Sequence, residues 1–133
     1  MDTSRKPICH KYLCVQVAIW THLDAWTQRE LWAASYKSDE FGSATGAGDA
    51  MIAGFLLAFL RGLDPGKSLK IANMVGWQNI RKMDALSGIE DWPSTLKMVN
   101  DRSRVLNSLH IQNNGWHFHT KEKIFYGPSD RNR

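Results

Sequence analysis

The sequence predicts an α/β fold in which strands are followed by helices packed on a sheet. A run rich in strand-forming residues at 30–36 stands ahead of an apolar helical pattern that begins at Asp49. Between them lies the small-residue stretch 42–49, with the sequence Gly-Ser-Ala-Thr-Gly-Ala-Gly-Asp, which runs into the helix without a break. We therefore expect a glycine-rich turn between strand and helix, and the rest of the chain is organised around it.

The composition is that of one globular domain with a modest core. Of 133 residues, 43% are hydrophobic and 23% are charged, and the formal net charge is +4. This mild excess favours anionic ligands such as nucleotides, but a nucleic-acid surface needs denser basic clustering. No apolar run reaches the length of a transmembrane helix. We expect neither a nucleic-acid partner nor a membrane.

Residues 1–25 are expected to form a leader followed by a strand. Residues 12–20 are rich in strand-forming side chains, and the polar link to 30–36 permits a hairpin. Gln16 interrupts the apolar run and no small-residue cleavage site follows, which favours a strand over a signal sequence. Cys9, His10 and Cys14 fall short of zinc-site spacing. Free thiols in a cytoplasmic protein are therefore expected.

Three helices are predicted downstream. Apolar residues of the first form a stripe expected to pack on the sheet: Ile52, Phe55, Leu56, Phe59 and Leu60. Gly62 should end this helix. The second should run over 65–81 with an inner side formed by Leu69, Ala72, Val75, Gly76 and Ile80. The third should start at a cap on Asp91 or Trp92, with Pro93 in its first turn.

Residues 101–133 are predicted to form a basic tail that ends in a hairpin. Six Lys or Arg face three acids in this tail. Residues 116–119 and 124–126 alternate like strands on either side of 120–123. His117 and His119 would share one face, which leaves a metal site conceivable. A surface pair of histidines is favoured, because no carboxylate or cysteine is placed beside them.

The stretch from Thr45 to Asp49 carries the chemical prediction. A small-residue turn that opens a helix leaves backbone N–H groups without partners, and the helix dipole adds positive charge there. Gly46, Ala47 and Gly48 are therefore expected to bind a phosphate. Asp49 places a carboxylate beside that anion, where it can take the proton of a hydroxyl that attacks phosphorus. On these residues alone, a plain helix start is an equal alternative.

Residues 45–56 read Thr-Gly-Ala-Gly-Asp-Ala-Met-Ile-Ala-Gly-Phe-Leu. This string resembles the C-terminal signature of the ribokinase-like, or PfkB, family of carbohydrate kinases. Downstream, residues 72–76 look like the family's second helix beside the adenine of ATP, and 84–89 look like the loop that follows it. Upstream, the run from Arg29 to Phe41 resembles the strand that leads into the signature. In all, the similarity covers about residues 26–98.

The resemblance implies the C-terminal part of a ribokinase-like α/β fold, with nucleotide and phosphate binding in residues 26–100. It implies ATP-dependent phosphoryl transfer to a hydroxyl of a sugar or sugar-like alcohol, with ATP and Mg²⁺ as cofactors. The implied site comprises Asp49 as the catalytic residue, Gly46, Ala47 and Gly48 as the anion hole, and Thr45, Asn73 and Gly76 as cofactor-binding residues. No metal ligand is assigned. Ala72 and Gly76 are also compatible with helix packing alone, and Asn73 with a solvent-facing side chain.

The chain also departs from the family pattern. Ser43 and Ala44 stand where the family often has an acid and a threonine, which argues against a monovalent-cation loop. The parts that hold the sugar, shape the lid and help place magnesium have no counterpart before Trp26. The chain therefore resembles the C-terminal piece of a kinase, whose activity would require the missing half. The alternative is a non-catalytic remnant that binds nucleotide or a partner. Uncovered sheet edges and apolar helix faces would favour self-association or pairing with the missing half.

Overall fold

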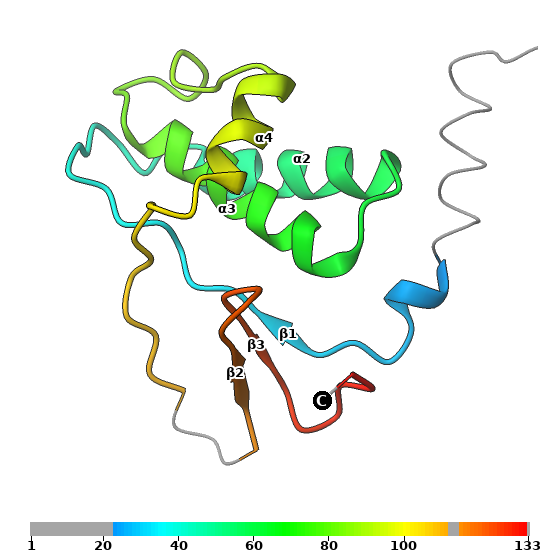
Figure 1. Ribbon diagram of the computed structural model, residues 1–133. Helices are drawn as coiled ribbons and strands as arrows, with labels where there is room; N and C mark the ends of the chain where they lie inside the picture. Colours follow the sequence, from blue (N-terminus) through cyan, green and yellow to red (C-terminus); the bar gives the residue numbers. More distant parts are fainter. Residues whose placement is uncertain (1–22, 112–114, 133) are drawn as a thin grey trace, which may run out of the picture.

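The computed structural model describes residues 23–111 and 115–132 (Figure 1). Its elements in chain order are the 3₁₀ helix η1 (Leu23–Trp26), β1 (Leu31–Trp32), α2 (Ala47–Leu60), α3 (Pro65–Ile80), α4 (Trp92–Asn100), β2 (His117–His119) and β3 (Ile124–Tyr126). The three α-helices gather in one layer and the strands form a small sheet beside them (Figure 1). Mixed helix and strand content agrees with the expected class. Among the described residues, no helix is both long and apolar enough to cross a bilayer.

The sheet is antiparallel, with the order β1-β3-β2. Phe118 pairs with Phe125 across β2 and β3, which confirms the predicted final hairpin. The strand predicted over 30–36 is shorter than expected, because only Leu31–Trp32 pairs with β3. Beyond it, the carbonyl oxygens of residues 33 and 34 accept hydrogen bonds from the Asn73 side chain, at 3.2 and 3.0 Å. The strand predicted at 12–20, its hairpin with 30–36 and both cysteines lie outside the described residues.

The C-terminal tail is tied to the start of β1 by a buried ion pair. Arg29 Nε lies 3.0 Å from Asp130 Oδ2, and the Asp130 side chain is fully buried. The Glu30 amide donates to the same oxygen at 2.9 Å. Burial acts to raise the pKa of Asp130, but hydrogen bonds from the amides of Glu30 and Asn132 and from Arg29 outweigh it and hold this pKa below its usual range. These contacts therefore hold the segment around Asp130 against the start of β1.

Helix α2 packs on α3 through a stripe of small residues. Ala50, Gly54 and Ala58 are its buried residues, and their spacing of four places them on one face. A Cβ at Gly54 would lie 2.8 Å from Val75 Cγ2, closer than side chains approach in real proteins. The two helices therefore touch with no room for a larger side chain between them.

The apolar stripe predicted for α2 does not face a sheet, so that expectation is wrong. Three of its residues are largely exposed: Ile52 (61%), Leu56 (50%) and Leu60 (42%). Phe55 and Phe59 are half-buried against the Trp26 ring of η1, with centroids 5.6 and 4.9 Å away and edge-on geometry. The spacing identified the helix correctly. It misplaced the inner face, because close approach to α3 requires the small residues there.

Helix α2 ends where the sequence predicted. Gly62 has a φ of 75°, in the left-handed region that favours glycine. Its N–H donates to Phe59 O at 2.9 Å, and Leu63 N–H donates to Ala58 O at 3.1 Å. This pair of bonds is a Schellman motif, which satisfies carbonyls at the helix end.

Helix α3 lies at the centre of the helical layer and is buried on most of its surface. The Asp64 side chain caps its start by accepting from Lys67 N at 2.9 Å. Its buried residues are Pro65, Gly66, Ser68, Ile71, Ala72, Met74, Gly76, Gln78 and Asn79. Ala72 and Gly76 of the predicted inner side are among them. Ile71 and Met74, which are almost completely buried, were not predicted, because a helix covered on several sides shows no single apolar stripe.

Helix α4 confirms the predicted cap. Asp91 accepts from Ser94 N at 2.8 Å, and the proline stands in the first turn. A buried hydrogen bond of 3.0 Å from Gln78 Nε2 to Thr95 Oγ1 joins α3 to α4. This polar link fixes the register of the two helices, because a buried amide left without a partner would be costly.

Candidate phosphate and nucleotide site

The glycine-rich turn is held against the end of α3. The amides of Gly42 and Ser43 donate to Ile80 O at 2.7 and 3.3 Å. A Cβ at Gly42 would collide with the backbone of Lys82, so only glycine fits at this crossing. The C-terminal end of α3 therefore holds the turn that leads into α2 in a fixed position.

Gly46 is the residue at which the chain enters α2. It is the N-cap, with φ 78° and ψ −1°, a left-handed conformation in place of the extended one that cap residues usually adopt. A Cβ there would lie 3.0 Å from Ala85 Cβ. The fully buried Asn79 holds the loop around Ala85 in that position. Its Nδ2 donates to Ala85 O at 2.6 Å. Backbone angle and lack of space both require glycine at this position.

The backbone donors at the start of α2 are largely free. Within the described residues, the N–H groups of Gly46, Gly48 and Asp49 donate to no protein acceptor. The Ala47 amide differs from the expectation, because it donates to Ala44 O at 3.1 Å. The Cβ position of Gly48 has no heavy atom within 4 Å, so this side of the turn is open. Free donors at a helix N-terminus are the physical requirement for binding an anion.

Asp49 stands in the first turn of α2 with an exposed side chain. Among the described residues it forms neither an ion pair nor a side-chain hydrogen bond, so its carboxylate is available beside the free amides. Thr45 is also exposed. Its amide donates to Ser43 Oγ at 3.1 Å, and Ser43 Oγ donates to Thr45 Oγ1 at 3.0 Å. Ser43 therefore serves the local turn.

A cavity of about 280 Å³ lies next to this helix start. We call it the α2–α3 cavity, because both helices contribute to its wall. Its lining residues are Ser35, Tyr36, Ser38, Phe41, Ala47, Met51, Asn73, Gly76, Trp77, Ile80 and Asn107. Three of the sequence-predicted site residues, Ala47, Asn73 and Gly76, therefore line one space, although they come from two helices. Thr45, Gly46, Gly48 and Asp49 do not line it and lie on the adjoining turn and first helical turn.

Asn73 and Gly76 have structural roles as well as a place in the cavity wall. The Asn73 side-chain nitrogen donates to Ala33 O and Ala34 O, which leaves its Oδ1 as the atom that can accept from a ligand. A Cβ at Gly76 would lie 2.5 Å from Met51 Cγ of α2. Close helix packing alone therefore accounts for glycine at 76.

Trp77 is the most prominent wall residue that sequence reasoning missed. Its indole Nε1 donates to Lys37 O at 3.0 Å. The guanidinium carbons of Arg81 and Arg104 lie 4.4 and 4.6 Å from its ring centroid, so two cations flank one aromatic ring. Arg81 lies one helical turn after Trp77 and is a local neighbour, but the sequence around Trp77 gives no signal of Arg104, which comes from the segment after α4.

The described residues show no ready-made metal centre. They contain no group of three or more His, Cys, Asp or Glu side chains positioned to hold a metal ion. His117 and His119 are exposed on β2, and the His119 ring packs edge-on against Tyr126 at 5.4 Å.

Comparison with known proteins supplies the family. The model of the pfkB family of carbohydrate kinases matches residues 18–92, more than half of the chain. A search of curated proteins found no match, and a search of solved structures found none. The matched range contains the glycine-rich turn, α2 and α3. The chain belongs to the pfkB family of carbohydrate kinases.

Proposed function

We propose that this chain carries the nucleotide and phosphate site of an ATP-dependent carbohydrate kinase. The observation that carries the proposal is the start of α2, where three amides that donate to no acceptor in the described part of the chain lie beside an exposed carboxylate. In phosphoryl transfer the protein mainly positions the groups and stabilises charge on the equatorial oxygens. The N–H groups of Gly46, Gly48 and Asp49 would supply that stabilisation, strengthened by the helix dipole.

The α2–α3 cavity is suited to a flat heteroaromatic base. Its volume of about 280 Å³ is small, and its lining includes Trp77, Phe41 and Asn73. We propose that adenine occupies this space, with Asn73 Oδ1 accepting from its exocyclic amino group. Ala47 lines the cavity and also belongs to the phosphate turn. A base in the cavity would therefore direct its phosphates toward Gly48.

Asp49 is the residue proposed to act on the acceptor alcohol. Its carboxylate would take the proton from a sugar hydroxyl as the oxygen attacks phosphorus. General-base contributions of this kind amount to roughly 10²- to 10⁴-fold in rate. The side chain is exposed in the described part of the chain, so it contributes by its position at the helix start.

The test is the substitution Asp49→Asn in the full chain, with Asp24→Asn as the matched control on η1, also an exposed position. ATP binding is followed by calorimetry, and phosphoryl transfer by ADP release with a panel of sugars in the presence of Mg²⁺. We expect Asp49→Asn to keep nucleotide affinity within about threefold and to lose at least 10²-fold in transfer rate. Equal loss of binding and transfer, or full activity of Asp49→Asn, would contradict the proposed role.

A second candidate function is nucleotide binding without transfer. The exposed face of α2 favours it, because Ile52, Leu56 and Leu60 present apolar surface that a whole kinase domain would be expected to cover. Under this alternative, the wild-type chain binds MgATP but releases no ADP with any sugar of the panel. The same two assays therefore separate the two functions.

A further inference from the structure

A second cavity, of about 340 Å³, lies between the helical layer and the hairpin. We call it the basic cavity. Four stretches form its wall: part of α3, the segment 33–36, the chain at 99–106 where α4 ends, and the β2–β3 turn at 120–123. None of the residues from Thr45 to Asp49 lines it. Tyr36 and Asn73 line both cavities, so the two spaces are neighbours with separate chemistry.

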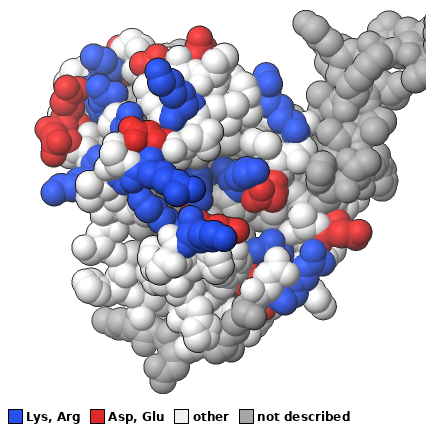
Figure 2. Space-filling view, in the orientation of Figure 1, with Lys and Arg blue, Asp and Glu red and all other residues white. Residues whose placement is uncertain are grey.

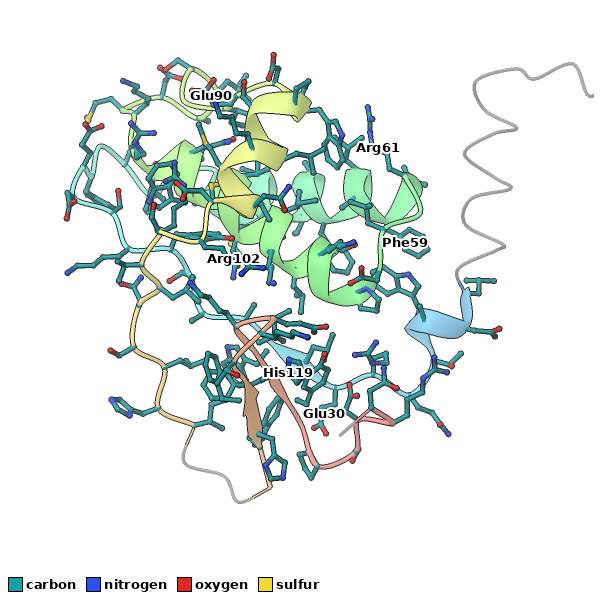
Figure 3. All side chains as sticks on the ribbon, viewed as in Figure 1. Glu30, Phe59, Arg61, Glu90, Arg102 and His119 are labelled. Carbon is teal, nitrogen blue, oxygen red and sulfur yellow. The ribbon has the colours of Figure 1, made fainter. Side chains whose placement is uncertain are left out.

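The wall of this cavity has a strong positive excess. Its basic side chains are Lys70, Arg102, Arg104, Lys121 and Lys123, and its acids are Asp101 and Glu122. Figure 2 shows Lys and Arg side chains gathered near the middle of this face, below α4. Arg102 lies between the end of α4 and the β2–β3 turn (Figure 3). Cations from three segments that are distant in the sequence therefore converge on one hollow.

The two acids are already engaged within the protein. Asp101 accepts from the amide and the hydroxyl of Ser103, at 3.0 and 2.7 Å. Glu122 accepts a short hydrogen bond from the hydroxyl of Tyr126. The nearest approach of Asp101 to a cation of the wall is 3.9 Å, to Arg104 Nε, which is too long for a hydrogen bond. Five basic side chains against these two carboxylates still leave the wall with a net positive charge.

Two of the cations are held in place by contacts that leave donors free. Lys123 adopts φ 55°, uncommon for a residue other than glycine, and its Nζ donates to Arg102 O at 3.1 Å. The guanidinium of Arg104 is fixed over the Trp77 ring, and its buried Nε has no hydrogen-bond partner in the described part of the chain. A buried charged donor without an acceptor is costly unless a ligand supplies one.

Lys70 adds a partly buried ammonium from α3. Burial lowers its pKa, Glu122 and Asp64 oppose this effect, and Lys123 and Lys67 reinforce it. Among the described residues, no carboxylate lies within 4 Å of its Nζ. An anion in the cavity would compensate this lysine together with Lys123.

We propose that the basic cavity binds a phosphoryl group, either as free phosphate or as the phosphate monoester of a small metabolite. A phosphate dianion offers several acceptors for lysine and arginine donors that converge from different directions. The volume is near the lower limit for small-molecule sites, which suits a compact ligand. Val99, Leu106 and Ala33 form an apolar part of the wall, against which the uncharged body of a monoester would pack.

The test is titration calorimetry of the full chain with two probes, orthophosphate and glycerol 3-phosphate. The variant is Lys70→Met, which keeps the length of the side chain and removes its charge. We expect loss of one charge-assisted contact to weaken binding by roughly tenfold or more. The control is Lys67→Met, three residues away on α3 but exposed and outside the cavity, which should bind as the wild type does.

The remaining outcomes also decide the proposal. Tighter binding of glycerol 3-phosphate than of orthophosphate would identify the monoester, and the reverse would identify free phosphate. If Lys70→Met fails to fold, Lys121→Met on the exposed turn replaces it, with the same expected loss. Three results would overturn the proposal. These are no binding of either probe, equal affinity of the Lys70→Met and Lys67→Met variants, and tighter binding of a short single-stranded oligonucleotide.

Discussion

Alanine substitutions at Gly46 and Gly48 should change stability in opposite directions, although the two glycines are two residues apart. Gly46 has φ 78°, and its Cβ would lie 3.0 Å from Ala85 Cβ. Gly48 lies in the first turn of α2, and its Cβ would meet nothing within 4 Å. Alanine should therefore be strained at 46 and tolerated at 48.

The magnitudes follow from these environments. An L-residue in the left-handed region costs roughly 1–2 kcal/mol, and the close contact with Ala85 adds to that cost at Gly46. At Gly48, alanine gains up to about 1 kcal/mol from its better helix propensity. The two variants should therefore differ by about 2–3 kcal/mol in free energy of unfolding. For a chain of this size, that corresponds to about 5–10 °C in Tm.

The assay is urea unfolding and thermal melting followed by far-ultraviolet circular dichroism, with MgATP affinity measured on the same samples. We expect Gly46→Ala to be less stable than the wild type and Gly48→Ala to be at least as stable. Gly48→Ala should still bind MgATP more weakly, because the new methyl group occupies the open side where phosphate is proposed to bind. Equal stability of the two variants would refute the argument from backbone geometry.

Three further predictions concern the frame around the site. Asp130→Asn should reduce stability at pH 7 and flatten the pH dependence of stability. The folded-state pKa of Asp130 is depressed, so its contribution to stability is present above the unfolded pKa of about 3.9 and is lost as pH falls through the folded pKa. Urea unfolding between pH 7 and 3 measures this. Leu56→Gln should change the free energy of unfolding by at most about 0.5 kcal/mol, because the side chain is half exposed, whereas a loss above 2 kcal/mol would show that it is buried in a core. Trp26→Ala should cost about 2 kcal/mol, because it removes edge contacts with two phenylalanines, and an unchanged unfolding midpoint would show that η1 does not support α2.

Local signals in the sequence were sufficient for several elements. The structure contains three predicted features: the helix cap at Asp91, the end of α2 at Gly62 and the final hairpin. Each depends on interactions within a few residues. The glycine-rich turn also leads directly into α2, although the helix begins at Ala47, two residues before the predicted Asp49. Such features can be predicted because their physical cause lies in adjacent residues.

The partners of each face could not be predicted in the same way. The stripe at Ile52 and Leu56 has the spacing of a buried face, but the close packing of α2 on α3 selects Gly54 instead. The early end of β1 depends on Asn73, about 40 positions downstream. Such choices are made by contacts between distant segments, which periodicity does not record.

Only part of the candidate site was accessible from the sequence. The motif indicated free amides at Gly46, Ala47 and Gly48 with Asp49 beside them, and within the described residues the amides of Gly46 and Gly48 are free whereas that of Ala47 is bonded to Ala44 O. The wall of the α2–α3 cavity also includes Trp77, which no motif marks. The basic cavity brings Lys70 together with the tail, although the tail alone carries only a mild charge excess. Charges from separate segments add up only once the chain is folded.

The central claim is that the free amides at the start of α2 bind the phosphates of a nucleotide. The most direct measurement is an amide ¹H–¹⁵N NMR titration of the full chain with MgATP. The account predicts the largest shifts at the N–H groups of Gly46, Gly48 and Asp49, with smaller ones at Asn73 and Gly76. Shifts confined to other segments, or none at saturating MgATP, would contradict it.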